Sequence, residues 1–139
     1  MKIKVHQLNK QASIPKKTGI NNNIFNLIAI SREIDNNGCI VYKTGLAFEI
    51  PLGYIGLIVP YDSISNKDII LSNCVGIINS MCSEEVIFRY KHIDNINKAI
   101  STNPNGHYVY RFTTGIDYQP GDIIGQLIII TLPEIEFEY

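Results

Sequence analysis

The chain has 139 residues, 45% hydrophobic and 18% charged, which is typical of one globular domain with its own core. We therefore interpret residues 1–139 as a single domain. The formal net charge of −1 argues against a nucleic-acid-binding surface built on bulk positive charge, so no nucleic-acid partner is predicted. No signal-peptide core is present, and no apolar run approaches the roughly 18 residues that span a bilayer, so no membrane partner is predicted.

The residues that could bind a metal are scattered. The three cysteines and three histidines show neither C-x-x-C nor H-x-x-x-H spacing, which argues against a disulfide framework and a zinc site. Reduced thiols fit a cytosol, or a particle assembled there. Asn and Ile are abundant and Trp is absent, as in proteins from AT-rich genomes such as those of many phages.

Turn-forming residues punctuate the chain about every 8 to 12 residues, and the runs between them are rich in β-branched and aromatic residues. The predicted strands are Lys2–Leu8, Ile24–Ser31, Gly38–Lys43, Leu46–Glu49, Tyr54–Pro60, Ile69–Leu71, Gly76–Ile78, Glu85–Lys91, His107–Thr113 and Ile123–Thr131. Short strands at this spacing predict an all-β sandwich or barrel.

One segment departs from the strand pattern. Ile93, Ile96 and Ile100 recur at the spacing i, i+3, i+7, which predicts a short helix over His92–Ile100. Ser101–Gly106 follows as a predicted loop that ends in an Asn-Gly turn signal. We expect this segment to be an added surface element that either caps the barrel or meets a partner.

The C-terminal segment alternates apolar with acidic residues from Pro133 to Tyr139. This alternation predicts an exposed strand, and an exposed strand edge needs a pairing partner. We expect a neighbouring subunit to supply it.

Three segments match a known family in order and spacing. They are Val59-Pro60-Tyr61-Asp62-Ser63-Ile64, Val75-Gly76-Ile77-Ile78-Asn79-Ser80-Met81-Cys82-Ser83-Glu84-Glu85-Val86 and Pro120-Gly121-Asp122-Ile123-Ile124-Gly125-Gln126-Leu127. They resemble three of the five motifs of the trimeric dUTPases, and the similarity runs from about Lys43 to Tyr139. The resemblance implies a dUTPase-like β-barrel or jelly-roll (β-clip) subunit in a homotrimer with a swapped C-terminal strand.

The family hydrolyses dUTP to dUMP and pyrophosphate, with a carboxylate that activates water and with Mg²⁺ on the triphosphate. In the third motif, Asn79 replaces the general-base Asp and Cys82 replaces the Tyr that supports the deoxyribose. An amide has no useful basicity near neutral pH, and a thiol offers no stacking face. Turn formation and core filling are the simpler interpretation of Asn79 and Cys82.

The other motifs also depart from the family pattern. In the second motif, Tyr61 stands where a cation is usual, and Asp62 places a negative charge before the retained Ser63, where a phosphate would lie. A solvated turn residue is the simpler interpretation of Asp62. In the first motif, Asn26 replaces the Asp that reaches Mg²⁺ through water.

The fourth motif keeps Gly121 and Asp122, interpreted as turn residues, and Gln126, which could face a pocket. The glycine-rich arm that forms the fifth motif has no counterpart before Tyr139, so we expect no lid over the site.

Together these departures predict a catalytically inactive dUTPase-like trimer without cofactors, in a structural or binding role. A phage virion protein, such as a capsid decoration or fibre adaptor, and a regulator that binds a host protein both fit, and imply a location in the virion or the host cytoplasm. The alternative is a divergent, Mg²⁺-dependent dUTP pyrophosphatase with Glu84 or Glu85 as base. A dCTP deaminase of the same superfamily has no positive motif in the sequence.

Overall fold

The computed structural model describes residues 1–16, 23–93, 99–102, 108–110 and 116–139. Its strands are β1 (Lys4–Gln7), β2 (Ile24–Ile28), β3 (Ser31–Ile34), β4 (Ile40–Lys43), β5 (Leu46–Glu49), β6 (Tyr54–Val59), β7 (Ile69–Leu71), β8 (Gly76–Ile78), β9 (Ile87–His92), β10 (Ala99–Thr102), β11 (Tyr108–Tyr110) and β12 (Ile123–Thr131). Among these residues the only helix is the 3₁₀ helix η1 (Asp62–Asn66). None of the described helical structure could cross a membrane.

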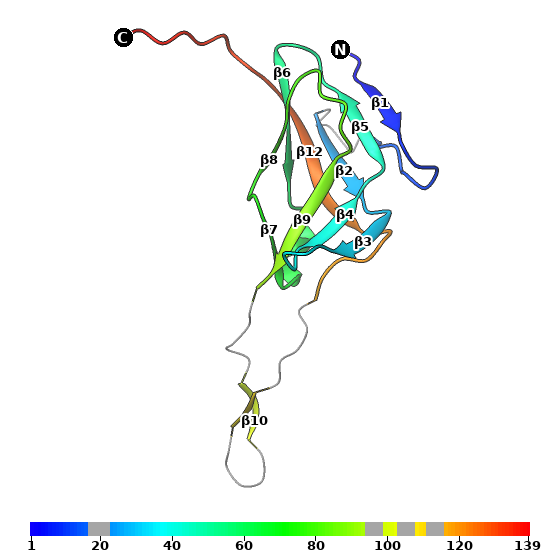
Figure 1. Cartoon of the computed structure of the whole chain (residues 1–139), viewed down its shortest axis with the longest axis vertical. Helices are drawn as coiled ribbons and strands as arrows, with labels where there is room; N and C mark the ends of the chain where they lie inside the picture. Colours follow the sequence, from blue (N-terminus) through cyan, green and yellow to red (C-terminus); the bar gives the residue numbers. More distant parts are fainter. Residues whose placement is uncertain (17–22, 94–98, 103–107, 111–115) are drawn as a thin grey trace.

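Two four-stranded antiparallel sheets form the body of the protein (Figure 1). Their strand orders are β2-β12-β6-β8 and β3-β4-β9-β7. Strand β12 is central, because it pairs with β2 on one side and β6 on the other. Gly125 on β12 faces Phe88 on β9, and a Cβ at this position would collide with the ring, so glycine permits the close approach of the two sheets.

Buried tyrosines fill the space between the sheets. The rings of Tyr42, Tyr90 and Tyr118 meet edge to face, with centroids 5.8–6.1 Å apart. Tyr42 donates its hydroxyl to the carbonyl of Tyr118 at 2.8 Å and accepts from the Tyr118 N–H at 3.0 Å. Burial raises the pKa of Tyr42 to about 12 and raises the pKa of Tyr90 further. These polar contacts let large aromatic side chains lie in the core without unsatisfied hydroxyls.

The opposite face of the β2-β12-β6-β8 sheet is largely aliphatic, with the Asn26–Gln126 pair at one end of it. Ile58 and Leu127 point into the core, so their neighbours along each strand point outward. The register places Ile128 opposite Ile24 and Leu57, and Leu57 opposite Ile77. The outer apolar face consists of Ile24, Ile55, Leu57, Ile77, Ile128 and Ile130. Ile77 is 63% exposed, which makes this face an unpartnered surface in the single chain.

Most of the strands follow the sequence prediction, and the main difference in the first half of the chain concerns one predicted strand. The predicted strand Ile24–Ser31 is divided, because β2 ends at Ile28 and β3 begins at Ser31 in the other sheet. The fourth-motif turn forms a hydrogen bond at this break, because the Gly121 N–H donates to the Ala29 carbonyl. The chain therefore crosses between the two sheets at the position where a continuous strand was predicted.

The helix predicted over His92–Ile100 is wrong at both of its described ends. Strand β9 continues through His92, and Ala99–Thr102 forms β10, which pairs with β11 in a separate antiparallel hairpin. Cross-strand pairing of a segment with β-branched residues outweighs a three-residue helical stripe. Ser101 and Thr102 of the predicted loop belong to β10, and residues 94–98, 103–107 and 111–115 lie outside the described part of the chain.

The chain segments that lead to and from the hairpin both form hydrogen bonds with one residue of the sandwich, Asp68. Ile93 donates its N–H to the Asp68 carbonyl at 2.8 Å, and Asp68 donates its own N–H to the Ile116 carbonyl at 2.8 Å. The Asp68 carboxylate accepts the Ile116 N–H at 2.9 Å. Figure 1 shows β10 away from both four-stranded sheets. The hairpin is therefore attached through a compact base at the end of β7 and β9.

The C-terminal segment forms no strand within its own chain, as far as the described residues show. After β12, residues 132–139 run away from the body of the protein (Figure 1). Ile135 is 69% exposed and Phe137 is 83% exposed. The strand predicted for Pro133–Tyr139 therefore stays a prediction about an assembly.

Candidate functional site

The motif residues fall into two groups at opposite ends of β6. Asn79 and Cys82 follow β8, whose last residue pairs with the first half of β6 through Ile78 and Gly56. Tyr61 and Ser63 follow the other end of β6. A rise of about 3.3 Å per residue separates the two groups by roughly 15–20 Å along the strand. One copy of the chain therefore does not bring all the motif residues together.

Asn26 and Gln126 lie side by side because β12 pairs with β2 in a register that sets them opposite each other. Gln126 donates an Nε2 proton to Asn26 Oδ1 at 2.9 Å, and both side chains are half-buried. The structure thus joins the predicted first-motif and fourth-motif residues. Two neutral amides occupy this position, and the Asn26 oxygen already accepts a hydrogen bond.

The second-motif residues surround the start of η1. Ser63 Oγ lies 2.8 Å from the hydroxyl of the buried Tyr118, and either group can donate. Lys67 Nζ lies over the same ring, 5.0 Å from its centroid. Tyr61 is half-buried, whereas Asp62 is exposed at the first position of η1. The Ser63 hydroxyl is therefore engaged with the core, and the Asp62 carboxylate meets solvent.

Asn79 belongs to a tight turn after β8. Its side chain is exposed, and its carbonyl accepts the Cys82 N–H at 3.3 Å. Met81, inside the turn, has φ +61°, a backbone conformation that side-chain-bearing residues seldom adopt. The Met81 N–H donates to the Ile50 carbonyl at 2.9 Å, which holds the turn against the loop before β6. The turn is therefore well anchored although its side chains face solvent.

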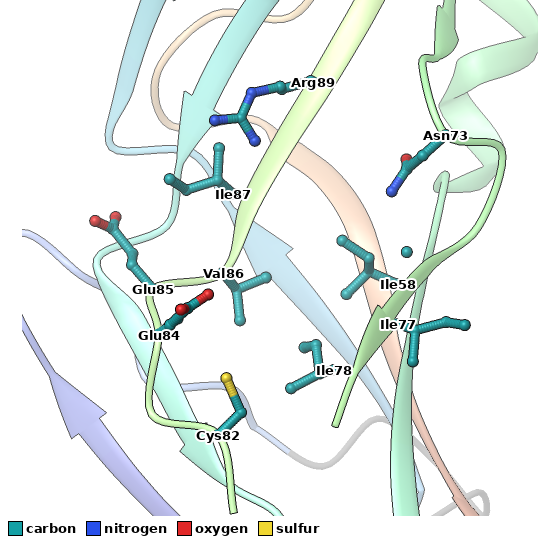
Figure 2. A pocket seen from close by; sticks show the side chains of 11 residues that line it. Ile58, Asn73, Ile77, Ile78, Cys82, Glu84, Glu85, Val86, Ile87 and Arg89 are labelled. Carbon is teal, nitrogen blue, oxygen red and sulfur yellow. The ribbon is translucent and has the colours of Figure 1, made fainter. Parts of the chain in front are cut away.

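A cavity of about 340 Å³ lies between β8 and the segment that leads into β9. Figure 2 shows Cys82 and Glu84 on one side of it, and Ile58, Ile77 and Asn73 on the other. Its lining consists of Ile58, Asn73, Gly76, Ile77, Ile78, Cys82, Glu84, Glu85, Val86, Ile87 and Arg89. Of the replaced motif residues, Cys82 lines this cavity, and the residues around Ser63 and Gln126 lie elsewhere.

The two glutamates proposed as alternative bases have different surroundings. Glu85 Oε2 accepts the Gly45 N–H at 3.0 Å, and Gly45 has φ +69°, so Glu85 stabilises a turn that precedes β5. Glu84 is exposed at the cavity rim. Asn73 and Arg89 also line the cavity and were not singled out from the sequence, because isolated polar residues in a turn and a strand carry no recognisable pattern.

The fourth-motif turn has the structural role that was predicted for it. Gly121 adopts φ +96°, and the Asp122 carboxylate accepts the Gln119 N–H at 2.8 Å. Both residues close the turn that leads into β12.

The described residues do not fit a magnesium centre held by the protein. They contain no group of three or more His, Cys, Asp or Glu side chains that could hold a metal ion. The position that resembles the family's magnesium-linked Asp carries Asn26, whose side-chain oxygen accepts from Gln126. Mg²⁺ prefers carboxylates and phosphate oxygens, which the amides of Asn26 and Gln126 do not supply.

Comparisons with known proteins match the chain to dUTPases, by sequence over a short segment and by structure over nearly its whole length. No family model matches the chain. A deoxyuridine 5'-triphosphate nucleotidohydrolase of Escherichia phage T5 is 37% identical over 49 residues, which cover 35% of this chain and 33% of that protein. The matched part of the chain thus spans about a third of the length of this curated relative.

Solved structures of phage dUTPases resemble the chain over its whole length. The dUTPase of Staphylococcus bacteriophage 80α, solved with dUpNHpp, has a TM-score of 0.75 at 18% identity over 99% of this chain and 87% of that one. A mutant dUTPase from phage phi11 of S. aureus has a TM-score of 0.73 at 19% identity over 100% of this chain and 96% of that one. At these identities the similarity shows the fold, and it confirms the predicted all-β, dUTPase-like subunit.

Proposed function

We propose that this chain, which has the dUTPase fold, forms a homotrimer with a structural or binding role and does not hydrolyse dUTP. The polar groups at the motif positions carry this proposal. Asn26 and Gln126 are neutral amides bonded to each other, and Ser63 is bonded to Tyr118. Asn79, where the resemblance places the general base, is also an amide and accepts no proton from water near neutral pH.

The charge at the second motif also opposes a triphosphate. Asp62 is exposed beside Tyr61, at the position where the resemblance places donors to phosphate. Two like charges about 4 Å apart repel by about 1 kcal/mol in water, and by more in a less polar site. The second motif thus disfavours the ligand that the family binds there.

The outer apolar face supports a homotrimer. A row of aliphatic side chains crosses four strands of one sheet, from Ile24 through Ile128 and Leu57 to Ile77. A monomer would leave this face in contact with water, and contiguous exposed apolar patches mark interaction sites. Packing against equivalent copies would bury it, and the separation of the two motif groups along β6 also calls for a second copy to complete any shared site.

The biological role that we propose is that of a phage virion protein, such as a capsid decoration or fibre adaptor. The relatives are phage proteins, which supports a phage setting. A regulatory role in the host cytoplasm is the second form of a non-catalytic function. The 80α dUTPase, described as controlling transfer of virulence genes by a proto-oncogenic G protein-like mechanism, supports that form.

An active dUTP pyrophosphatase is the alternative function, and two observations favour it. One is the 37% identity to the phage T5 enzyme over 49 residues. The other is the cavity beside β8, whose rim carries the exposed carboxylate of Glu84. In this alternative, Glu84 or Glu85 replaces the missing base, and Mg²⁺ is required.

Pyrophosphate release from dUTP with Mg²⁺ tests the two functions directly. We expect no release by the unmodified protein and none by Asn79→Asp, because a general base contributes its roughly 10²- to 10⁴-fold only to a substrate held in place. A phage dUTPase is the positive control, and the other deoxynucleoside triphosphates test for a changed substrate. Release that stops on chelation of Mg²⁺ and in Glu84→Gln or Glu85→Gln would establish the alternative.

A further inference from the structure

A polar cavity of about 330 Å³ lies between the linker after β1, the start of β3 and the end of β4. Its volume is sufficient for a small molecule. The only lining residue that it shares with the cavity beside β8 is Glu85. Its polar lining consists of Asn9, Gln11, Ser31, Glu33, Lys43 and Glu85. The cavity therefore suits a hydrophilic ligand and lies apart from the other motif positions.

Backbone hydrogen bonds fix the walls of this cavity. Leu8 donates its N–H to the Gly45 carbonyl at 2.7 Å, and Ile30 donates its N–H to the Lys43 carbonyl at 2.8 Å. A Cβ at Gly45 would lie 2.9 Å from the Cβ of Ala12, so glycine lets the linker pack against the turn before β5. The cavity is therefore formed before any ligand arrives, and binding would require little reordering of the chain.

Three charged side chains line the cavity without being paired to one another. The register sets Ser31 opposite Lys43, and Glu33, two residues further along β3, lies on the same face of the sheet. Glu85 lines the cavity from the segment that leads into β9. None of the ion pairs in the described part of the chain involves Glu33, Lys43 or Glu85. Their charges are therefore available to a ligand.

The Ser31 hydroxyl is a buried group that lacks a partner. Its Oγ forms no hydrogen bond with any of the described residues. Buried polar groups in folded proteins are nearly always paired, so an unpaired one calls for an explanation. A ligand carboxylate bound beside Lys43, which lies opposite Ser31, would supply the missing partner.

The charges of the cavity select the class of ligand. Two carboxylates and one ammonium group match a molecule that carries two cations and one carboxylate. A simple anion would meet two repelling carboxylates. A diamine would leave Lys43 unpaired, and an amino acid with a neutral side chain would leave one glutamate unpaired.

We propose that this cavity binds a free basic amino acid such as lysine. The ligand carboxylate would bind the Lys43 ammonium group and the Ser31 hydroxyl. Its two ammonium groups would bind the Glu33 and Glu85 carboxylates, in charge-assisted hydrogen bonds. The site lies within one chain, so it depends neither on the trimer nor on the absence of dUTP hydrolysis.

Four related ligands test each contact separately. L-lysine carries all three charged groups, whereas L-norleucine lacks the side-chain ammonium group, 6-aminohexanoate lacks the α-ammonium group and cadaverine lacks the carboxylate. Isothermal titration of the full chain at low ionic strength measures each dissociation constant. We expect a constant below about 1 mM for L-lysine and a constant at least 10-fold higher for each of the others. Undetectable binding of L-lysine, or equal constants for L-lysine and L-norleucine, would overturn the proposal.

Substitutions in the lining test whether the ligand occupies this cavity. Lys43→Met and Glu33→Gln each remove one contact, so we expect each to raise the dissociation constant for L-lysine at least 10-fold. Lys91→Met, at an exposed position on β9 of the same sheet, is the matched control and should leave the constant unchanged. Circular dichroism checks that each variant is folded. Equal behaviour of Lys43→Met and Lys91→Met would overturn the assignment.

A second measurement needs no substitution. In nuclear magnetic resonance spectra of the unmodified chain, L-lysine should shift the amide signals of residues 9–11, 31–33 and 43–45, which surround the cavity. Shifts centred on another part of the chain would overturn the assignment. Pyrophosphate release and molar mass test the proposed function independently, so a failure at this cavity would leave that proposal standing.

Discussion

Single side chains decide which chemistry the motif positions can support. The Asn26 and Gln126 amides satisfy each other at 2.9 Å, and the Ser63 hydroxyl is held by Tyr118 at 2.8 Å. A hydrogen-bonded neutral group is stable where a half-buried lone carboxylate would require a cation or a metal. Changes at these positions therefore act on local stability as well as on any reaction.

Tyr42 offers a pH test of the core at the scale of one residue. Burial raises its pKa to about 12, above the value of about 10 in an unfolded chain. The stability that neutral Tyr42 contributes is fully present below about pH 10 and is lost as pH rises toward 12. Tyr42→Phe should flatten this decline in urea unfolding and should lower stability at pH 7 by about 1–3 kcal/mol, because the Tyr118 N–H loses its partner.

The control for this measurement is Leu52→Ala, at an exposed position outside the core. It should change neither the stability at pH 7 nor the slope between pH 10 and 12. An unchanged alkaline slope in Tyr42→Phe would contradict the assignment of the decline to this hydroxyl.

At the scale of elements, the hairpin of β10 and β11 is attached to the sandwich by polar contacts at its base. The Arg32 guanidinium donates to both carboxylate oxygens of Asp117, at 3.2 and 2.8 Å. His92 Nε2 lies 3.7 Å from Asp117 Oδ2. Together with the bonds of Asp68, these contacts hold the chain where it leaves β9 and where it returns. The two ends are thus fixed independently of the hairpin itself.

Replacement of residues 94–115 by a Gly-Ser linker of about six residues should leave the sandwich folded. Ile93 and Ile116 both bond to Asp68, so a short linker can join them. We expect an unchanged β-sheet circular dichroism signal, a melting temperature within a few degrees, and an unchanged number of chains per particle. Loss of the folded state would mean that the segment completes the core, and loss of binding to a partner alone would support a surface role.

At the scale of the whole molecule, the outer apolar face should hold copies of the chain together. Ile128→Glu places a carboxylate in the middle of this face, and burial of an unpaired charge costs several kcal/mol. We expect the variant to remain folded and to dissociate, as measured by light scattering after size exclusion. Ile70→Glu, on β7 in the other sheet, is the matched control and should keep the mass of the intact protein.

A monomeric Ile70→Glu variant, or an unchanged mass for Ile128→Glu, would show that another surface carries the assembly. The C-terminal segment is predicted to provide an independent contact in the proposed trimer. A partial loss of mass with Ile128→Glu would therefore still assign the outer face to the interface.

The sequence by itself determined the strand content and the fold class, because both depend on local patterns. Alternation and turn residues located most of the strands that the structure contains, and the spacing of the motifs indicated the dUTPase fold. The identities at Asn79, Cys82 and Asp62 are likewise readable without a structure. The chemistry of each substituted group follows from its type alone.

Only the tertiary structure decided which of these residues meet. The pairing of Gln126 with Asn26, 100 positions apart, depends on the register of β12 and β2. The bond between Ser63 and Tyr118 depends on packing between elements. The helix predicted near His92 failed because strands form at both of its described ends, where β9 pairs with β7 and β10 pairs with β11. Contacts set by register and packing are non-local, so no window of the sequence contains them.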